Sequence, residues 1–272
     1  MSSDDYLTMN RANWDARVPH HVRGYGIERF DDPAHLSETV RFDLPRLGDL
    51  TGKTIVHLQC HIGTDTLSLH RLGARVTGLD FSAPALIAAR ELAARIGAEA
   101  TFVESDVYGA PEVLPAAGFD LVYTGIGALC WLPDIDRWAR VVSALLKQGG
   151  ELFIREAHPM LWALGESTPD GRVVVEYPYF ETAGDVFTET STYVEHDGEV
   201  ASPTFISFNH GLAQIFNALW SAGLDITFFE EHDSVPWNGL GDVMVEGDLG
   251  EWRLRDRPER LAASYTLRAT KR

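Results

Sequence analysis

The stretch T-I-V-H-L-Q-C-H-I-G-T-D-T-L-S-L-H-R-L-G-A-R-V-T-G-L-D, from Thr54 to Asp80, decides the fold of this chain. It begins with an apolar run, 55–58, and a turn, 59–63, separates that run from a segment with helical spacing. A second apolar run, 75–79, ends in Asp80. The order strand, turn, helix, strand is that of a βαβ unit, which binds a nucleoside at the carboxyl ends of its strands.

The turn and its surroundings carry residue types that a nucleoside site needs. Gly63 supplies a residue without a Cβ, and Thr64 or Asp65 caps the helix that follows. Free N–H groups at the start of that helix favour a carboxylate or a phosphate. Asp80 comes about 20 residues after the turn, where an acidic side chain accepts hydrogen bonds from ribose hydroxyls.

The turn lacks the G-x-G-x-x-G pattern of dinucleotide-binding proteins. Gln59 and His61 stand where small residues would let a pyrophosphate approach the backbone. A nicotinamide oxidoreductase is therefore the weakest of the functions considered. The turn suits a nucleoside whose tail is an amino acid.

On these residues the chain resembles the class I S-adenosylmethionine-dependent methyltransferases. The first motif of that family is a strand with an acidic residue, followed by G-x-G-x-G. Here H-L-Q-C-H-I-G occupies that place, with His57 at the acidic position and Gly63 as the retained glycine. The longer stretch L-Q-C-H-I-G-T-D-T-L-S-L-x-R-L-G-A-x-V-T-G-L-D-F-S is similar to a bacterial subgroup of small-molecule methyltransferases. The resemblance extends from about residue 10 to the C-terminus.

The resemblance implies S-adenosylmethionine as the cofactor and identifies the residues that contact it. Asp106 matches an acidic residue that accepts a hydrogen bond from the adenine amino group. Simple packing is the alternative role for Trp14 and Tyr25, and a strand-end turn is the alternative for Asp106. The expected cofactor-binding residues are Trp14, Tyr25, Gln59, Cys60, His61, Gly63, Thr64, Asp80, Phe81, Ser105, Asp106, Val107, Thr124 and Gly125.

The expected fold is α/β, a doubly wound seven-stranded sheet. The resemblance implies the strand order 3-2-1-4-5-7-6 with strand seven antiparallel. We expect an N-terminal helical cap over 1–50, whose first helix packs loosely, and a cofactor-binding core over 51–159. An antiparallel β insert over 160–208 forms a lid on the substrate pocket, and 209–272 completes the core.

Four segments carry the strand predictions outside the first five core strands. Alternating residues predict insert strands at 173–177 and 186–194. The last two core strands are expected at 224–231 and 263–269, joined by a short return as a final hairpin.

Charge and composition narrow the partners. With 40 acidic and 23 basic residues, the formal net charge is −17, which disfavours nucleic acid and anionic membranes. Cys60 and Cys130 make no disulfide framework, and no secretory signal or apolar run of about 18 residues occurs. We expect a cytoplasmic monomer or homodimer with a small-molecule partner.

Methyl transfer from a sulfonium is an in-line displacement, so alignment and water exclusion dominate its catalysis. A base is needed only where the acceptor must lose a proton. His158 is the first candidate base, with Glu156 as its orienting partner, and His210 is the second. No Cys/His spacing predicts a metal site.

The leading hypothesis is therefore methyl transfer from S-adenosylmethionine to an O, N or C atom of a small metabolite. One alternative keeps the cofactor but changes the chemistry, to a cyclisation or the formation of another sulfonium. The other is a nucleoside-binding module without turnover, which the altered residues 59 and 61 keep open.

Overall fold

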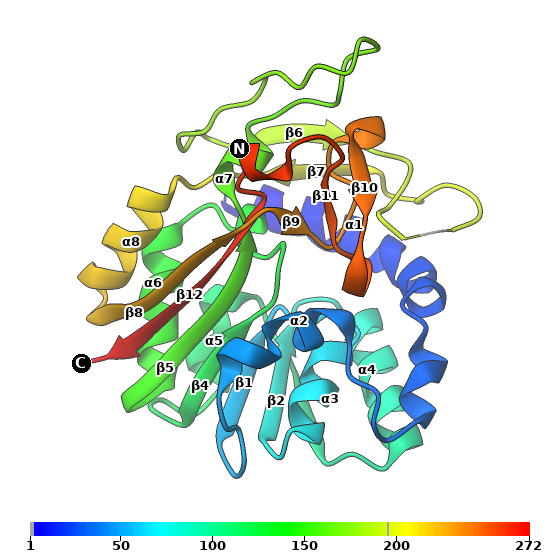
Figure 1. Ribbon diagram of the computed structural model, residues 1–272. Coiled ribbons are helices and arrows are strands. Elements are labelled where there is room, and N and C mark those ends of the chain that lie inside the picture. Colours follow the sequence, from blue (N-terminus) through cyan, green and yellow to red (C-terminus); the bar gives the residue numbers. More distant parts are fainter. Residues whose placement is uncertain (1–2, 195) are drawn as a thin grey trace.

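A seven-stranded sheet organises the computed structural model, which describes residues 3–194 and 196–272 (Figure 1). Its order is β3-β2-β1-β4-β5-β12-β8, and β12 is antiparallel to both of its neighbours. The predicted order 3-2-1-4-5-7-6 is confirmed, because β8 and β12 are the sixth and seventh strands of this sheet. The strands are β1 (Thr54–Leu58), β2 (Arg75–Asp80), β3 (Ala100–Glu104), β4 (Phe119–Thr124), β5 (Leu146–Ala157), β8 (Leu224–His232) and β12 (Ser264–Lys271).

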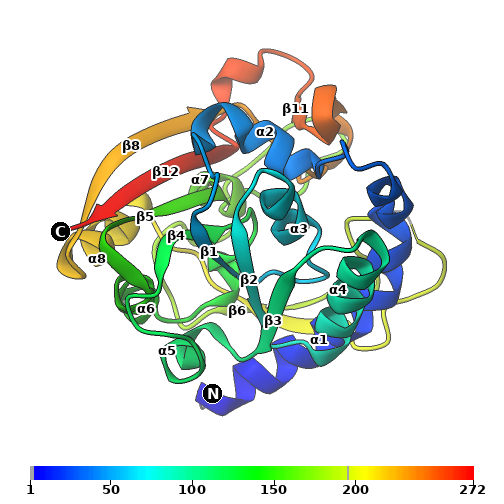
Figure 2. The same ribbon diagram turned by 90° about the horizontal axis from the view of Figure 1, so that it is seen from below.

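Helices cover both faces of this sheet (Figure 2). One face packs against α2 (Glu38–Leu47), α3 (Thr64–Arg71) and α4 (Ala83–Ile96). The other face packs against α5 (Ala110–Val113), α6 (Ile135–Leu145) and α8 (Leu212–Ser221), around the fully buried Trp138. Short 3-10 turns lie at 27–31, 107–109, 129–131, 241–243, 248–250 and 258–260.

Local sequence signals set the ends of these helices. The Ser82 hydroxyl accepts a hydrogen bond from the Ala85 N–H and caps α4, and Gly97 ends it with a φ of 67°. Asp134 caps α6 in the same way, through the N–H of Arg137. These caps fix where each loop leaves the carboxyl edge of the sheet.

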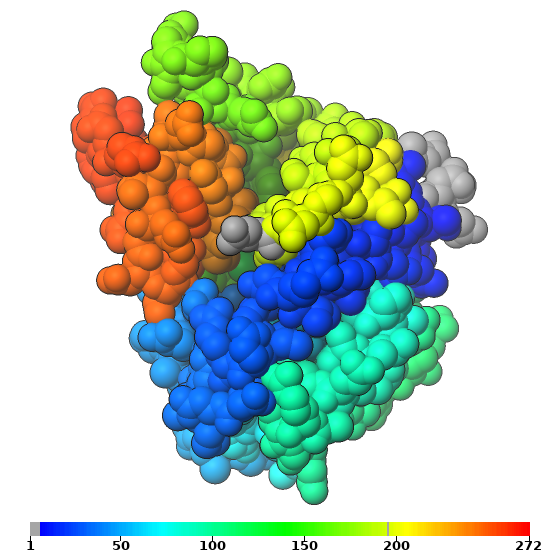
Figure 3. All heavy atoms as spheres, turned by 90° about the vertical axis from the view of Figure 1, so that its right-hand side faces the viewer, coloured from blue at the N-terminus to red at the C-terminus, as the bar shows by residue number. Residues whose placement is uncertain are grey.

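Helix α1 (Ser3–Gly24) lies across that edge, between the core and the insert (Figure 3). The prediction that this helix packs loosely is wrong. The Asn10 amide donates to the Ile206 carbonyl over 3.0 Å and accepts from the Ile206 N–H over 2.9 Å. Asn13 donates to the Ser202 carbonyl over 2.7 Å, and both asparagines are buried. Side-chain bonds to insert backbone thus hold α1 in place.

The insert forms one short ladder, between β6 (Asp185–Thr188) and β7 (Thr204–Ser207). The predicted strand at 186–194 is therefore confined to its first residues, and its partner β7 was not predicted. The predicted strand at 173–177 is wrong, since only Val175 bridges, to Leu164. Alternation gives a segment the propensity for a strand, but a ladder also needs a neighbouring backbone to pair with.

The final hairpin also differs from the prediction, because the return from β8 to β12 is long. This return contains a small sheet in the order β10-β11-β9. Elsewhere in the chain, the short helix α7 (Pro159–Trp162) follows β5. The strands of the small sheet are β9 (Ser234–Val235), β10 (Met244–Glu246) and β11 (Trp252–Leu254). A buried ion pair joins it to the main sheet: Arg155 on β5 donates to both carboxylate oxygens of Glu251, over 3.0 and 2.8 Å.

Replacing Arg155 with methionine should destabilise the fold by about 3–5 kcal/mol, because the Glu251 carboxylate would stay buried without its counter-ion. Urea unfolding of the purified variant measures this loss. Arg257→Met is the matched control, since Arg257 pairs with Asp256 on the surface and its loss should change stability by no more than about 0.5 kcal/mol. Equal losses in both variants would contradict a structural role for the buried pair.

Candidate functional site

The turn after β1 keeps a left-handed backbone without the usual glycines. Gln59 has a φ of 57° and His61 a φ of 50°, and Gly63 follows with 77°. A non-glycine residue in this region costs on the order of 1–3 kcal/mol, so the surroundings must hold it. The Gln59 amide donates to the Ala128 carbonyl over 3.0 Å, and the His61 N–H donates to the Asp80 carboxylate over 2.8 Å. Backbone strain of this kind is concentrated at active and ligand-binding sites, so it supports the hypothesis that this turn is functional.

Asp80 ends β2 beside this turn. Its second oxygen accepts from the Ser82 N–H over 2.9 Å, and the side chain is buried. Burial raises the pKa of Asp80 to about 6, against the lowering effect of its backbone donors. A carboxylate oxygen has more than one acceptor direction, so Asp80 retains capacity for ribose hydroxyls.

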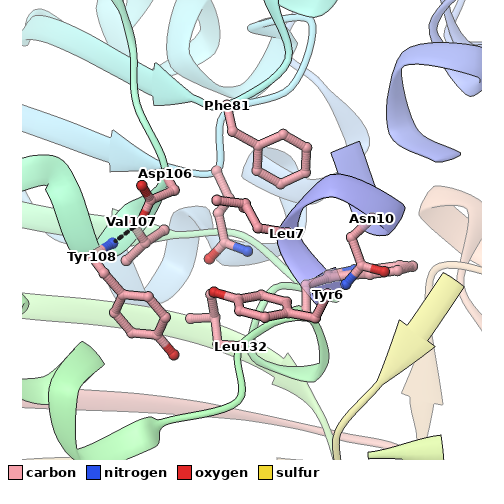
Figure 4. Close-up of a pocket in the computed structure, with 10 residues that line it drawn as sticks. Tyr6, Leu7, Asn10, Phe81, Asp106, Val107, Tyr108 and Leu132 are labelled. Atoms are coloured by element: carbon pink, nitrogen blue, oxygen red, sulfur yellow. Dashed lines mark hydrogen bonds between the residues drawn. The ribbon is translucent and has the colours of Figure 1, made fainter. Parts of the chain in front are cut away.

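A pocket opens between α1 and the ends of β2 and β3 (Figure 4). Asp106 borders it: one carboxylate oxygen accepts from the N–H groups of Tyr108 and Gly109. Within residues 3–194 and 196–272 the other oxygen has no hydrogen-bond partner, which leaves it for a donor such as an adenine amino group. The pocket lining is largely apolar and consists of Tyr6, Leu7, Asn10, Gln59, Phe81, Asp106, Val107, Tyr108, Trp131 and Leu132.

The far side of the turn is covered by the second half of α1. Trp14 contacts the His61 ring edge to face, with ring centres 5.0 Å apart, and contacts Trp131 at 5.2 Å. His21 Nδ1 and His61 Nε2 share a hydrogen bond of 2.7 Å. Tyr25 stacks on His21, and its hydroxyl bonds that of Tyr193 in the insert. The predicted residues Trp14, Tyr25 and His61 therefore lie together.

Burial keeps the two histidines of this cluster neutral. Burial, together with the charge of Arg17, lowers the pKa of His21 to about 2 and that of His61 to about 3. His21 Nε2 bonds the Thr192 hydroxyl over 2.8 Å. Neutral histidines with such low pKa values orient hydrogen bonds but are weak bases at neutral pH.

The end of β4 forms the floor of the site. A Cβ on Gly125 would lie 3.5 Å from a carboxylate oxygen of Asp65 and 3.6 Å from His57 Nε2, so both groups face this backbone. Burial raises the pKa of Asp65. Within residues 3–194 and 196–272, the buried Thr124 hydroxyl has no hydrogen-bond partner. Thr124 and Gly125 thus lie beside an acidic group at the position expected of them.

Ten of the fourteen predicted cofactor residues do not line the pocket, and four of these ten have structural roles. Cys60 points into the core against Phe102, and burial raises the pKa of its thiol. The Ser105 hydroxyl donates to the Asp106 carbonyl. Gly63 and Thr64 shape the start of α3, where a Cβ on Gly63 would lie only 2.9 Å from Ala89. These positions support the site through the backbone.

The structure argues against the predicted catalytic pair. His158 Nδ1 accepts the Met160 N–H over 3.0 Å and caps α7, and Nε2 lies 3.2 Å from Glu231. The ring therefore has no free lone pair with which to take a proton. Glu156 does not orient His158, because both of its carboxylate oxygens accept backbone N–H groups.

Glu156 instead holds the loop after β4. Its buried carboxylate accepts four backbone N–H groups over 2.7–2.8 Å, from Gly127, Ala128, Leu129 and Ala157. This loop presents Trp131 to the pocket. Glu156 is thus a positioning residue for the site.

His210, the second candidate base, also has a structural bond. Its Nε2 donates to the Leu132 carbonyl over 2.7 Å, and Nδ1 lies 3.7 Å from Glu181. It lines a different small cavity, with Tyr265 and Trp162. None of the three predicted catalytic residues lines the pocket that Asp106 borders.

Several site residues escaped the sequence reasoning although their spacing was visible. Successive intervals of three or four residues place five side chains along one side of α1, and Tyr25 continues this spacing just after the helix. The five are Tyr6, Asn10, Trp14, Arg17 and His21; of the six residues, Trp14 and Tyr25 were predicted. Asp65 was read only as a helix cap, and Tyr193 comes from a part of the insert without regular structure.

The part of the chain that the structure describes has neither a metal-binding cluster nor a helix that could span a membrane. It holds no group of three His, Cys, Asp or Glu side chains arranged to bind a metal ion. None of its helices is long and apolar enough to cross a membrane.

Comparison with known proteins bears on the same residues. A model of the methyltransferase domain family matches residues 56–152. A ubiquinone biosynthesis O-methyltransferase from Sodalis glossinidius is 33% identical over 147 residues, which cover 53% of this chain and 58% of that protein. The chain thus spans little more than half the length of the curated relatives it matches.

Two solved structures share the fold. An S-adenosylmethionine dependent methyltransferase from Mesorhizobium loti superposes with a TM-score of 0.61 at 24% identity, over 86% of this chain and 98% of that one. The [4+2]-cyclase SpnF gives a TM-score of 0.53 at 18% identity, over 86% and 79%.

Residues 56–152 thus match a methyltransferase domain, and they lie within a sheet whose strand order is the one expected for class I methyltransferases.

Replacing Glu156 with glutamine should destabilise the protein by at least about 2 kcal/mol. The glutamine NH₂ cannot accept the N–H donors it would face, and each buried unsatisfied group costs about 1–3 kcal/mol. Urea unfolding at neutral pH measures the effect against the exposed control Glu112→Gln. Indistinguishable midpoints for the two variants would show that the carboxylate does not hold this loop.

Proposed function

We propose that this protein transfers a methyl group from S-adenosylmethionine to a small molecule. One observation carries the proposal: the Asp80 carboxylate is fixed at the strained turn, next to a largely apolar pocket bordered by Asp106. Ribose hydroxyls need an acceptor, and an adenine ring needs apolar walls with an acceptor for its amino group. The two carboxylates provide these acceptors from neighbouring strand ends.

The residues of the site suit the remaining part of the cofactor as well. Asp65 and the backbone of Gly125 provide a carboxylate and a close approach for the methionine ammonium group. Asp65 thereby replaces the acidic residue that the family has at the position of His57. The cofactor, when bound, supplies the sulfonium methyl group, and the protein residues hold and orient it.

Space is the constraint on cofactor entry. The pocket has a volume of about 10 Å³, which is about what one water molecule requires. Trp14 lies between His61 of the turn and Trp131 of the β4 loop. A nucleoside therefore enters only if α1 moves away from the turn, and the return of α1 excludes water from the site.

Within residues 3–194 and 196–272, the histidines beside the turn are neutral with low pKa values and His158 caps α7, so none of them is a strong base beside the turn. We therefore propose catalysis by alignment and water exclusion, which suits an acceptor atom that is already nucleophilic. The ubiquinone relatives and the glycopeptide N-methyltransferase among the fold neighbours act on small molecules by their names, which supports a small acceptor.

The alternatives make the same use of the site but stop before methyl transfer. The likeness to the [4+2]-cyclase SpnF supports a non-methylating reaction on this fold. A nucleoside-binding module without turnover is favoured by the replacement of two glycines with Gln59 and His61.

Calorimetric titration of the full chain with S-adenosylmethionine, S-adenosylhomocysteine and NAD tests the proposal. We expect saturable binding of both adenosyl compounds and none of NAD, because the turn has no room for a pyrophosphate. An acceptor screen by mass gain of one methyl group then separates methyl transfer from the alternatives. Absence of adenosyl binding would refute the proposal.

The affinity for S-adenosylhomocysteine should fall as the pH drops below about 6. The pKa of Asp80 is raised to about 6, so the carboxylate that accepts from ribose is present above that value and is protonated below it. Titrations between pH 5 and pH 8 (about one unit apart) measure the trend, which can reach tenfold per unit.

Two variants isolate Asp80 in that experiment. Asp80→Ala should weaken binding more than tenfold, since a charged acceptor contributes about 1.5–3 kcal/mol. Asp80→Asn should remove the fall in affinity for S-adenosylhomocysteine below about pH 6. A wild-type pH profile that Asp80→Asn reproduces unchanged would exclude Asp80 as the titrating group.

A further inference from the structure

Arg17 on α1 is a buried cation without a matching anion. The residue is 4% exposed. Its guanidinium Nε and Nη2 have no hydrogen-bond partner within residues 3–194 and 196–272. The one ion pair it makes there is loose, with Nη2 3.8 Å from the carboxylate of Glu189, a side chain that is 55% exposed.

Such an arrangement is costly unless something completes it. A buried charge needs a close counter-charge and satisfied donors, and burial lowers the pKa of Arg17 accordingly. Two aromatic rings flank the guanidinium, with the Trp14 centre at 5.7 Å and the Phe205 centre at 5.3 Å. These cation–π contacts satisfy the faces of the group but leave its N–H donors directed elsewhere.

Arg17 is not among the residues that line the pocket bordered by Asp106, but aromatic contacts connect it to the turn and to Trp131, which does line that pocket. Trp14, which it contacts, lies against His61 of the turn and Trp131 of the β4 loop. Trp131 in turn contacts Phe205 with ring centres 5.2 Å apart. The surroundings of Arg17 thus combine aromatic walls from α1, the β4 loop and the insert.

The other titratable groups near Arg17 do not supply an anion at neutral pH. His21 and His61 are neutral, and burial raises the pKa values of Tyr25, Tyr193 and Cys130. Among the described residues, Glu189 is left as the single charged group that acts on Arg17, and burial raises the pKa of Glu189 as well.

We propose that Arg17 binds a carboxylate group of a ligand in the site that α1 covers. The guanidinium fork matches a carboxylate in shape and charge, and the two unpaired nitrogens, Nε and Nη2, form one edge of that fork. The inference rests on the proposed function, which provides two sources of this group. They are the methyl acceptor, which would then be a small acid with an aromatic or apolar body, and the methionine tail of the cofactor.

The experiment uses the full chain and four proteins: wild type, Arg17→Gln, Arg17→Lys and the control Arg23→Gln. Arg23 lies on the same helix but is exposed, so its replacement removes the same charge from outside the site. Calorimetry measures S-adenosylhomocysteine, which has the amino-acid tail, and 5′-methylthioadenosine, which lacks it. With saturating S-adenosylhomocysteine present, benzoate and its neutral counterpart benzamide are then titrated.

The two sources give different results, and either one supports the proposal. If the tail is the ligand, Arg17→Gln weakens S-adenosylhomocysteine at least tenfold and leaves methylthioadenosine unchanged. If the acceptor is the ligand, both adenosyl compounds bind Arg17→Gln normally, and the preference for benzoate over benzamide disappears. Arg17→Lys, which keeps the charge but loses the fork, should fall between wild type and Arg17→Gln and serves alone if Arg17→Gln does not fold.

The proposal is overturned if both Arg17 variants match Arg23→Gln for every ligand, whether or not benzoate binds. Failure of the wild type to bind either adenosyl compound is a distinct result. It would remove the proposed function and the role of Arg17 with it.

Discussion

The hydrogen bond from the His61 N–H to the Asp80 carboxylate is the constraint on which the site depends. It joins the turn after β1 to the tip of β2 and holds His61 in a left-handed conformation that favours glycine. Gln59 is held in a similar way by the hydrogen bond that its side-chain amide donates to the loop after β4. The family turn is thus retained by side-chain bonds where glycine would have adopted it freely, and the replaced residues contribute an imidazole and an amide to the site.

Two further carboxylates, those of Glu156 and Asp106, also hold loops of this edge by accepting hydrogen bonds from backbone N–H groups. Glu156 gathers four N–H groups and fixes the loop after β4, and Asp106 fixes the turn after β3 through the N–H groups of Tyr108 and Gly109. Buried backbone N–H groups require partners, and loops at the edge of a parallel sheet have few from secondary structure. Acidic side chains therefore support the loops of this edge, and Asp80 and Asp106 are also the residues proposed to contact the ligand.

Helix α1 converts this open edge into an enclosed site. Asparagine side chains bond it to the insert, while Trp14 and His21 contact the turn. The enclosure desolvates the ionisable groups, which explains the neutral histidines and the raised pKa of Asp80. The side chains of Tyr6 and Val18 on α1 are also buried against the core, so movement of this helix away from the edge would expose apolar surface as well as break polar contacts.

The sequence by itself determined the sheet, because the βαβ stretch 54–80 and the periodic segments after it carry their own caps, glycines and apolar faces. It also indicated two acidic side chains of the site: the place of Asp80 follows from the βαβ spacing, and that of Asp106 from the family resemblance. Only the tertiary structure decided which ring nitrogens of the candidate bases are engaged. His158 Nδ1 accepts a hydrogen bond from the Met160 N–H, and His210 Nε2 donates one to the Leu132 carbonyl. It likewise brought Arg17 and Tyr193 to the site, because contacts between residues far apart in the chain depend on how α1 and the insert pack, and local propensity does not encode that packing.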